Sequence, residues 1–257
     1  MAKIQLHNIK KTYPLPNNPR PLLVLDSLNA SISDGEIVTL LGPNGCGKTT
    51  LLKLIAGIED IDRGSITLNE CDPKHADCGF IVQNYDDSLL PWLSALDNIL
   101  FPFTLRNRRK QRLAAESHLN ELLRTLSLTL PLEHYPYQLS GGQKQVVSLL
   151  RTLLCNPDVL LMDEPFSALD HPTRLYMHKL LLSLWQQWTL TIVFVSHDIE
   201  EAMLLGERLF LMGSLPSQIT HVYELPFTPI QRSERLESST FASLKNELID
   251  LLSTTHL

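Results

Sequence analysis

The chain has 257 residues, of which 44% are hydrophobic, and its formal net charge is −6 at pH 7. A chain of this length and apolar content can bury a sizeable core, which excludes a disordered protein. The acidic balance argues against a general nucleic-acid-binding protein, which would present a strongly basic surface.

The sequence contains no long apolar run and no cysteine pair of the C-x-x-C type. Residues 1–14 contain no apolar stretch long enough for a signal peptide, and the longest later apolar runs fall far below the roughly 18 residues that a membrane span needs. The cysteine spacing suits neither a zinc site nor a disulfide framework. We therefore expect a soluble chain with reduced thiols at Cys46, Cys71, Cys78 and Cys155.

Short strands are predicted in the first third of the chain. Residues 3–9 (KIQLHNI) alternate apolar and polar, 36–42 (EIVTLLG) form an apolar run that ends in a glycine turn, and 64–69 (GSITLN) are bounded by turn residues. The pattern then becomes helical between about 84 and 155. The leucines with the spacing of one helix face are Leu119, Leu122, Leu123 and Leu126.

Two continuous apolar strands follow the helical insert. They are residues 159–164 (VLLMDE) and 191–196 (TIVFVS), and the helical segment 173–188 lies between them. This order predicts a strand, crossover helix and strand of a parallel sheet. A polar stretch after residue 225 precedes the amphipathic segment 241–252 (FASLKNELIDLL).

The glycine turn after the second predicted strand satisfies the pattern G-x-x-x-x-G-K-[ST]. Its defining residues are Gly42, Gly47, Lys48 and Thr49, with a strand before and a helix after. Glycines let backbone N–H groups approach phosphate oxygens, and the helix N-terminus adds partial positive charge. Lys48 would reach the β and γ phosphates, and Thr49 would bind Mg²⁺. The alternative is a structural glycine turn with an incidental lysine.

An acidic pair ends the strand 159–164. Asp163 would enter the shell of Mg²⁺, and the adjacent Glu164 would polarise the attacking water. Such a pair is a weak signal by itself, because many strands end in polar residues. Together with the phosphate loop it predicts nucleoside triphosphate hydrolysis.

The segment LSGGQ at 139–143 resembles the signature motif of the ATP-binding-cassette ATPases. Further motifs of that family occur in the same order along nearly the whole chain: Tyr13, the phosphate loop, Gln83, LSGGQ, Asp163 with Glu164, SALD at 167–170, and His197 in VSHD. The resemblance implies an α/β phosphate-loop NTPase fold with a parallel core sheet, an N-terminal antiparallel β-subdomain and a helical signature subdomain. It implies an ATPase domain at 1–230, with the helical subdomain inserted at about 84–155, and a C-terminal helical extension at 231–257.

The resemblance also implies the roles of individual residues. Glu164, His197 and Gln83 are the expected catalytic residues, and Thr49, Gln83 and Asp163 are the expected Mg²⁺ ligands. ATP would be bound by Tyr13, which stacks on adenine, and by Gly42, Pro43, Asn44, Gly45, Cys46, Gly47, Lys48, Thr49 and Thr50. The signature residues Ser140, Gly141, Gly142 and Gln143, with Asp170, would face ATP bound to a second copy of the chain.

Several of these residues have simpler explanations. Tyr13 could be an ordinary surface tyrosine, Gln83 a plain polar residue at a strand end, and His197 a buried core histidine. The basic run 106–112 (RNRRKQR) is most simply a solvated helix start, with an anionic membrane surface as the alternative. Cys46 has a helix N-terminus and Lys48 nearby, which would favour a reactive thiolate; a buried, inert thiol is the alternative.

The segment 83–99 (QNYDDSLLPWLSALDNI) resembles the ATPases of nitrate, sulfonate and taurine importers. The resemblance implies a homodimer on the cytoplasmic face of the cell membrane, a separate permease contacted near Leu89–Trp92, and a solute-binding protein. We expect an exposed apolar patch at Leu89, Leu90, Pro91 and Trp92, unless Trp92 belongs to the core of the helical lobe. Val146 and GSLPSQI at 213–219 depart from the family pattern and leave the substrate subgroup open.

Two rival functions have different requirements. A soluble cassette protein of DNA repair or translation would usually carry a second cassette or a long coiled-coil insertion, and neither is present in the sequence. A small-molecule kinase with a phosphate loop would have no use for LSGGQ. The sequence therefore favours an importer ATPase.

Overall fold

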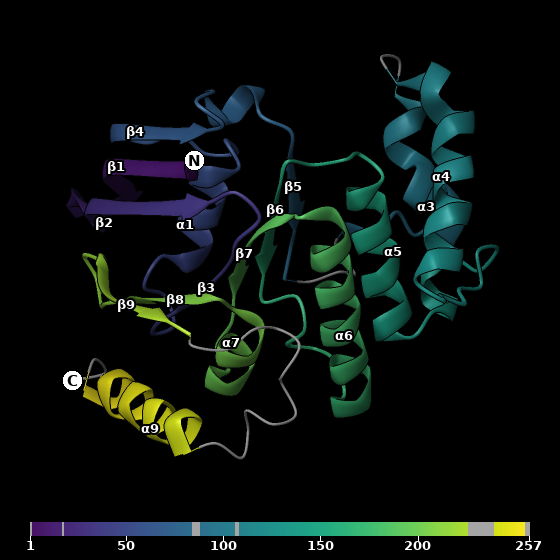
Figure 1. Cartoon of the computed structure of the whole chain (residues 1–257). Coiled ribbons are helices and arrows are strands. Elements are labelled where there is room, and N and C mark those ends of the chain that lie inside the picture. Colours follow the sequence, from purple (N-terminus) through teal and green to yellow (C-terminus); the bar gives the residue numbers. More distant parts are fainter. Residues whose placement is uncertain (1, 17, 84–87, 106–107, 226–238, 255–257) are drawn as a thin grey trace. The chain divides into compact units, whose positions relative to one another are not determined.

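A computed structural model describes residues 2–16, 18–83, 88–105, 108–225 and 239–254. The chain divides into two compact units, one formed by residues 1–76 with 189–257 and the other by residues 77–188 (Figure 1). The expected boundary after residue 230 lies outside the described residues.

The first unit begins with a three-stranded antiparallel sheet of order β2-β1-β4. Its strands are β1 (Ala2–Leu15), β2 (Asn18–Ser33) and β4 (Arg63–Leu68). Apolar side chains of these strands, such as Ile4, Leu6 and Leu28, are at most 2% exposed. This sheet is the antiparallel subdomain that the family resemblance implied.

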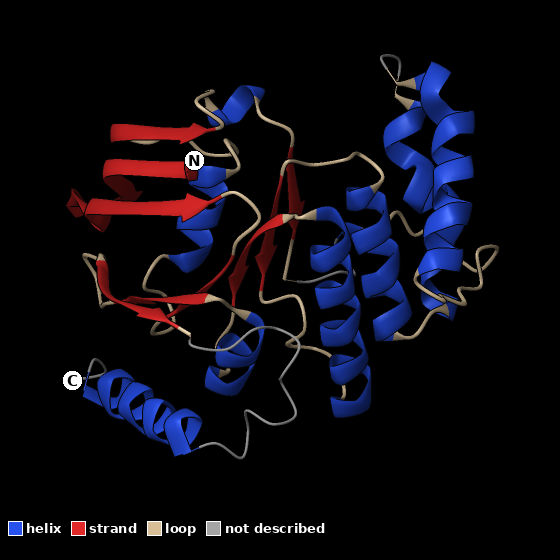
Figure 2. Ribbon diagram, viewed as in Figure 1, coloured by secondary structure: helices blue, strands red, loops and turns tan. Residues whose placement is uncertain are grey.

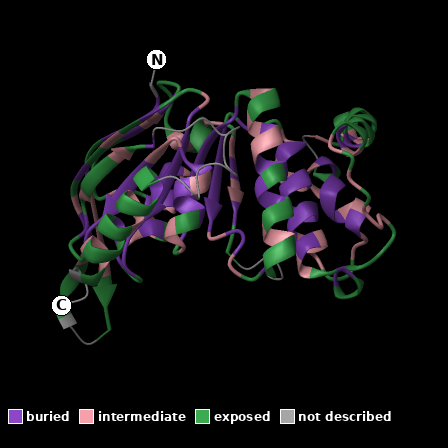
Figure 3. Ribbon diagram, turned by 60° about the horizontal axis from the view of Figure 1, so that its bottom comes forward, coloured by how far each residue is buried: buried purple, intermediate pink, exposed green. Residues whose placement is uncertain are grey.

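A second sheet in the same unit contains the parallel strands. The strand β3 (Ile37–Leu41) pairs in parallel with β7 (Thr191–Val195) and with β8 (Arg208–Met212), and β9 (Ile219–Glu224) is antiparallel to β8. All five residues of β3 and of β7 are buried, as expected for strands covered on both faces, and Figure 3 colours the central strands as buried. The predicted parallel core sheet is confirmed.

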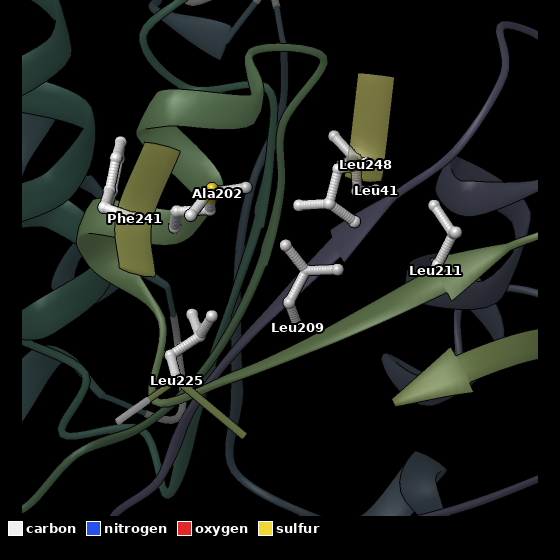
Figure 4. Packing of buried hydrophobic residues seen from close by; sticks show 8 residues of the cluster. Leu41, Ala202, Leu209, Leu211, Leu225, Phe241 and Leu248 are labelled. Carbon is white, nitrogen blue, oxygen red and sulfur yellow. The ribbon is translucent and has the colours of Figure 1, made fainter. Parts of the chain in front are cut away.

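The first unit also contains helical elements. They are α1 (Lys48–Ile55), the 3₁₀ turn η1 (Pro73–His75), α7 (Ile199–Leu205) and the C-terminal α9 (Ser239–Thr254). Phe241 and Leu248 of α9 are 3% and 0% exposed and pack in one cluster with Leu209 of β8 and Ala202 of α7 (Figure 4). The described part of the C-terminal segment is therefore an integral layer of the first unit.

The second unit contains two parallel strands and most of the helices. Its strands are β5 (Cys78–Ile81) and β6 (Val159–Asp163). Its helices are α3 (Ala95–Leu100), α4 (Arg112–Thr125), α5 (Gly141–Leu153) and α6 (His171–Trp188), with 3₁₀ turns η2 (Phe101–Thr104), η3 (Arg109–Gln111) and η4 (Pro136–Gln138) (Figure 2). The helix α5 packs against β5, α3 and α6.

The helical pattern expected between 84 and 155 is confirmed by α3, α4 and α5. Leu119 and Leu122 of α4 are 1% and 4% exposed and lie on its buried face, whereas Leu123 and Leu126 of the predicted stripe are half-buried. The basic run 106–112 lies partly outside the described residues. In its described part, Arg112 begins α4, and its guanidinium lies 3.0 Å from the carboxylate of Asp97 on α3. No described helix has both the length and the apolar character of a membrane span.

Candidate nucleotide-binding site

The loop 42–47 connects the buried strand β3 to α1. Gly45 and Gly47 have φ angles of 76° and 105°, in the left-handed region that side chains with a Cβ avoid. The N–H of Cys46 donates to Pro43 O at 3.3 Å, which closes the turn ahead of the helix. This geometry is typical of a phosphate-binding loop that ends at a helix N-terminus.

Lys48 is folded onto the loop that precedes it. Its ammonium donates to Gly42 O at 2.8 Å and to Pro43 O at 2.9 Å, and the residue is only 6% exposed. A buried cation at this position adds a full positive charge to the loop. Asn44 and Thr49 are exposed at the same turn. The sequence-predicted residues of the loop therefore lie together and combine backbone donors with a cation.

The expectation of a reactive thiol at Cys46 is wrong. The residue is 2% exposed, and burial raises the pKa of its thiol above the usual value, outweighing the opposing effect of Lys48. The sulfur lies on the core side of the loop, where a Cβ built on Gly42 would come within 3.1 Å of it. Desolvation of the thiolate therefore dominates over the helix N-terminus, and Cys71 is the exposed cysteine.

Tyr13 lies on β1 and is half-buried. Its hydroxyl donates to Glu59 Oε2, and the Lys11 ammonium lies 5.1 Å from the centre of its ring. Burial and the bond to Glu59 raise the pKa of Tyr13.

His197 follows β7 and lies next to the start of the phosphate loop. The parallel register pairs Leu40 with Val195, and the Ser196 N–H donates to Leu40 O at 3.2 Å, so the two strands end side by side. The Ser196 hydroxyl donates to Glu201 Oε2 at 2.6 Å and accepts the Asp198 N–H at 3.0 Å, which fixes this turn. His197 itself is exposed, so the alternative of a buried core histidine is wrong.

In the second unit, Gln83 and Glu164 meet beyond two parallel strands. The register pairs Ile81 of β5 with Met162 of β6, so the residues that follow are also neighbours. Gln83 Nε2 donates to Glu164 Oε2 at 2.8 Å. The Gln83 amide is therefore bonded to the carboxylate that is expected to be catalytic.

Glu164 has a strained backbone. Its φ angle is 45°, in the left-handed region, and its carbonyl accepts the Ser167 N–H at 3.3 Å and the Ser167 hydroxyl at 3.0 Å. Residues in such conformations cluster at functional sites, where the surrounding structure compensates for the strain. Asp163, which ends β6, is 5% exposed.

The signature segment begins α5 with a reciprocal cap. The Ser140 hydroxyl accepts the Gln143 N–H at 3.3 Å, and Gln143 Oε1 accepts the Ser140 N–H at 2.9 Å. Ser140 is exposed, and Gly142 is buried against α6, where an added Cβ would lie 2.3 Å from Thr173 Cγ2. The Asp170 carboxylate accepts the Thr173 N–H at 3.4 Å, and hydrogen bonding to Thr173 lowers the pKa of Asp170.

Trp92 projects from a turn that Asn98 supports. Trp92 is 70% exposed, so the alternative that it belongs to the lobe core is wrong. Leu89 is 4% exposed and does not contribute to the expected apolar patch. Asn98 Oδ1 accepts the Leu90 N–H at 2.8 Å, and its Nδ2 lies 3.0 Å from each of the carbonyls of Leu90, Leu93 and Ser94.

The sequence reasoning missed Asn98 and Glu59. Asn98 is 0% exposed, but it follows the charged Asp97 in the sequence and gave no clear signal. Glu59 lies in a run of acidic residues and gave no signal. No group of three or more His, Cys, Asp or Glu side chains in the described part of the chain could hold a metal ion.

A glycine loop of this geometry ahead of a helix defines a phosphate-loop nucleotide-binding protein. The family model described as "ABC transporter" matches residues 25–167. Among solved structures, a dimeric post-hydrolysis state of the ATP-binding cassette MJ0796 with ADP and Pi aligns with a TM-score of 0.71 at 30% identity, covering 88% of this chain and 100% of that chain. The chain therefore belongs to the ABC transporter family and is an ATPase of that family.

The chain is similar to curated importer subunits over almost its whole length. It is 36% identical to a taurine import ATP-binding protein of Jannaschia sp. (strain CCS1), covering 98% of this chain and 94% of the relative. It is 34% identical to a bicarbonate transport ATP-binding protein of Synechocystis sp. (strain ATCC 27184 / PCC 6803 / Kazusa), covering 98% of this chain and 89% of the relative. A trehalose import ATP-binding protein of Mycobacterium tuberculosis (strain ATCC 25618 / H37Rv) is 40% identical, covering 88% of this chain and 58% of the relative.

Proposed function

We propose that this chain is the ATP-hydrolysing subunit of an importer and that it drives uptake of a small anion through a separate membrane permease. The observation that carries the proposal is the bond between Gln83 and Glu164 in a chain that also has the phosphate loop. It supports a carboxylate positioned for water activation, and the exposed Trp92 in the same unit supports attachment to a partner.

The residues of the phosphate loop would bind the triphosphate. The backbone N–H groups of 44–49 and the Lys48 ammonium would contact phosphate oxygens, and Tyr13 would stack on adenine. Mg²⁺, when bound, neutralises charge on the β and γ phosphates. The Thr49 hydroxyl and the Asp163 carboxylate are hard oxygen donors that fit this ion, which takes few protein ligands because phosphates and waters supply the others.

Glu164 would accept a proton from the attacking water, and His197 would contact the γ-phosphate. The Gln83 amide, which donates to one oxygen of Glu164, would leave the other oxygen directed at the water.

Each chain has one phosphate loop and one signature segment, so two complete sites require two chains head to tail. Ser140 is exposed at the N-terminus of α5, which supports contact with a phosphate bound to the second copy. Replacing Ser140 by arginine would block that approach by size. We expect the Glu164→Gln protein to dimerise with Mg-ATP in size-exclusion chromatography, and the Glu164→Gln/Ser140→Arg protein to remain monomeric. Ser65→Arg, at an exposed serine on β4, is the matched control; dimerisation despite Ser140→Arg would contradict the shared site.

Trp92 and Pro91 would contact the permease on the cytoplasmic face of the membrane. A large aromatic side chain that is 70% exposed in a well-bonded turn is typical of an interface anchor. The taurine and bicarbonate relatives favour an anionic solute, delivered by a solute-binding protein, and the trehalose relative makes a sugar the second candidate.

The permease contact is tested by affinity purification of the tagged chain from detergent-solubilised membranes of its own organism. We expect an integral-membrane permease to copurify with the wild type and with Ile58→Ala, which also shortens an exposed apolar side chain to alanine but at a 59% exposed position of the other unit. Trp92→Ala should lose the permease, with a cost of about 2 kcal/mol in binding. Retention of the permease by Trp92→Ala would contradict the assignment of Trp92.

A further inference from the structure

The Glu59 carboxylate contacts the Tyr13 hydroxyl and two lysine side chains. The Tyr13 hydroxyl donates to Glu59 Oε2, and the ammonium groups of Lys53 and Lys11 lie 3.5 Å and 3.8 Å from the same carboxylate. The Glu59 side chain is 24% exposed and that of Lys11 is 12% exposed, so these charges are partly withdrawn from water. The Glu59 carboxylate therefore has one phenol hydroxyl and two ammonium groups around it.

The backbone around Glu59 is attached to the end of α1. The N–H groups of Ile58 and Glu59 both donate to Lys53 O, at 3.0 Å and 3.3 Å. The helix α1 begins at Lys48, directly after the phosphate loop. One short helix therefore carries the phosphate loop at its N-terminus and the acceptor for Tyr13 at its C-terminus.

The strand that carries Tyr13 is bonded to the same connection. The Thr12 N–H and hydroxyl donate to Asp62 Oδ2 at 2.7 Å and 2.6 Å, and the Lys11 ammonium donates to Asp60 O at 2.7 Å. The Lys11 ammonium also covers one face of the Tyr13 ring, 5.1 Å from its centre. A base that stacks on Tyr13 can then use only the opposite face.

We propose that Glu59 is the positioning residue for Tyr13: by binding the hydroxyl it holds the ring at a fixed distance from the phosphate loop, so that a nucleotide base stacks without a prior side-chain rearrangement. This inference rests on the proposed stacking of adenine on Tyr13. Ordering of the ring before binding removes an entropic cost that the ligand would otherwise have to offset. Glu59 therefore acts on the affinity for the base and leaves the affinity for the phosphates unchanged.

The experiment measures the affinity of the purified chain for two ligands, a non-hydrolysable ATP analogue and inorganic tripolyphosphate, which has no base. Tyr13→Ala should weaken binding of the analogue roughly fivefold to 150-fold, the range for loss of one base–aromatic stack. Tyr13→Phe and Glu59→Ala should each weaken it roughly threefold to tenfold, and the double variant should be no weaker than either single one. In all of these variants, the affinity for tripolyphosphate and the melting temperature of the protein should change little.

Two control variants separate the hydrogen bond from charge and from folding. Glu59→Gln keeps an acceptor for the Tyr13 hydroxyl and should bind the analogue within about twofold of the wild type, because an amide oxygen also accepts from a phenol. Asp60→Asn removes one negative charge from the next residue, whose carboxylate pairs with Lys74 at 2.5 Å, and should have no effect.

The outcomes distinguish this inference from the proposed function. If Tyr13→Ala binds the analogue normally, the stacking assignment fails. If Tyr13→Ala is weakened but Tyr13→Phe and Glu59→Ala are not, stacking stands and the role of Glu59 is overturned. Equal loss of both ligands in Glu59→Ala, or equal loss of the analogue in Glu59→Gln and Glu59→Ala, would also overturn it, because structural disruption or charge pairing with the lysines would then explain the effect.

Discussion

Asn98→Ala should destabilise the second unit and release the turn that presents Trp92. The amide has two N–H protons, so its three carbonyl contacts amount to about two full hydrogen bonds, and Oδ1 adds one from the Leu90 N–H. At about 1 kcal/mol for each bond, the expected loss in the free energy of unfolding is about 3 kcal/mol. The residue is 0% exposed, so water cannot replace these bonds without opening the turn.

Chemical denaturation followed by circular dichroism measures this loss. Iodide quenching of Trp92 fluorescence, in a background where Trp185 and Trp188 are phenylalanine, measures the turn itself, and Asn98→Ala should change the quenching constant. Asn120→Ala, at an exposed position on α4, is the matched control and should leave stability unchanged or slightly raised, because alanine favours a helix.

A second variant, Asn98→Asp, tests whether the N–H donors of the side chain stabilise the turn. The aspartate keeps an acceptor for the Leu90 N–H but directs an oxygen at the three carbonyls, so it should be at least as unstable as the alanine variant near pH 7. A loss below about 0.5 kcal/mol in Asn98→Ala, with unchanged quenching of Trp92, would refute the reasoning, since that is the range of ordinary surface substitutions.

Three further predictions concern catalysis, thiol chemistry and the C-terminal helix. Glu164→Gln should keep ATP binding but raise the barrier to hydrolysis by roughly 3 kcal/mol, and near-normal turnover in the assembled complex would contradict its role as a base. In native protein, mass spectrometry after brief N-ethylmaleimide treatment should find the exposed Cys71 labelled before the buried Cys46; the reverse order would contradict the burial of the loop thiol. Leu248→Ala should lower the free energy of unfolding by about 2–5 kcal/mol, whereas Ile249→Ala, 40% exposed, should cost far less; equal losses would mean that α9 does not pack as described.

Much of the fold follows from local patterns in the sequence. The strands β3, β6 and β7 are continuous apolar runs that end in polar or glycine residues, and such runs are typical of a sheet covered on both faces. The phosphate loop was predictable because its glycines and lysine are specified by backbone geometry within a few residues. The long strand β2 was not singled out, because its start contains prolines and polar residues.

The sequence-based predictions are wrong where tertiary packing determines which residues are buried. The sequence places Cys46 beside a lysine and a helix N-terminus, but only the packing of the loop against the core reveals that burial controls its thiol. Likewise Leu89 and Trp92 are both apolar residues of one segment, and only the turn bonded to Asn98 determines that one is buried and the other exposed. The bond between Tyr13 and Glu59 joins residues 46 positions apart and could not be read from either one.

The most direct test of the proposed function is solute uptake by vesicles in which this chain is reconstituted with the permease that copurifies with it and with the cognate solute-binding protein. We predict ATP-dependent accumulation of an anion such as taurine, another sulfonate, nitrate or bicarbonate, which Glu164→Gln abolishes while the complex stays assembled. Hydrolysis of ATP without uptake of any of these anions, or uptake of trehalose or another neutral sugar in their place, would contradict the account.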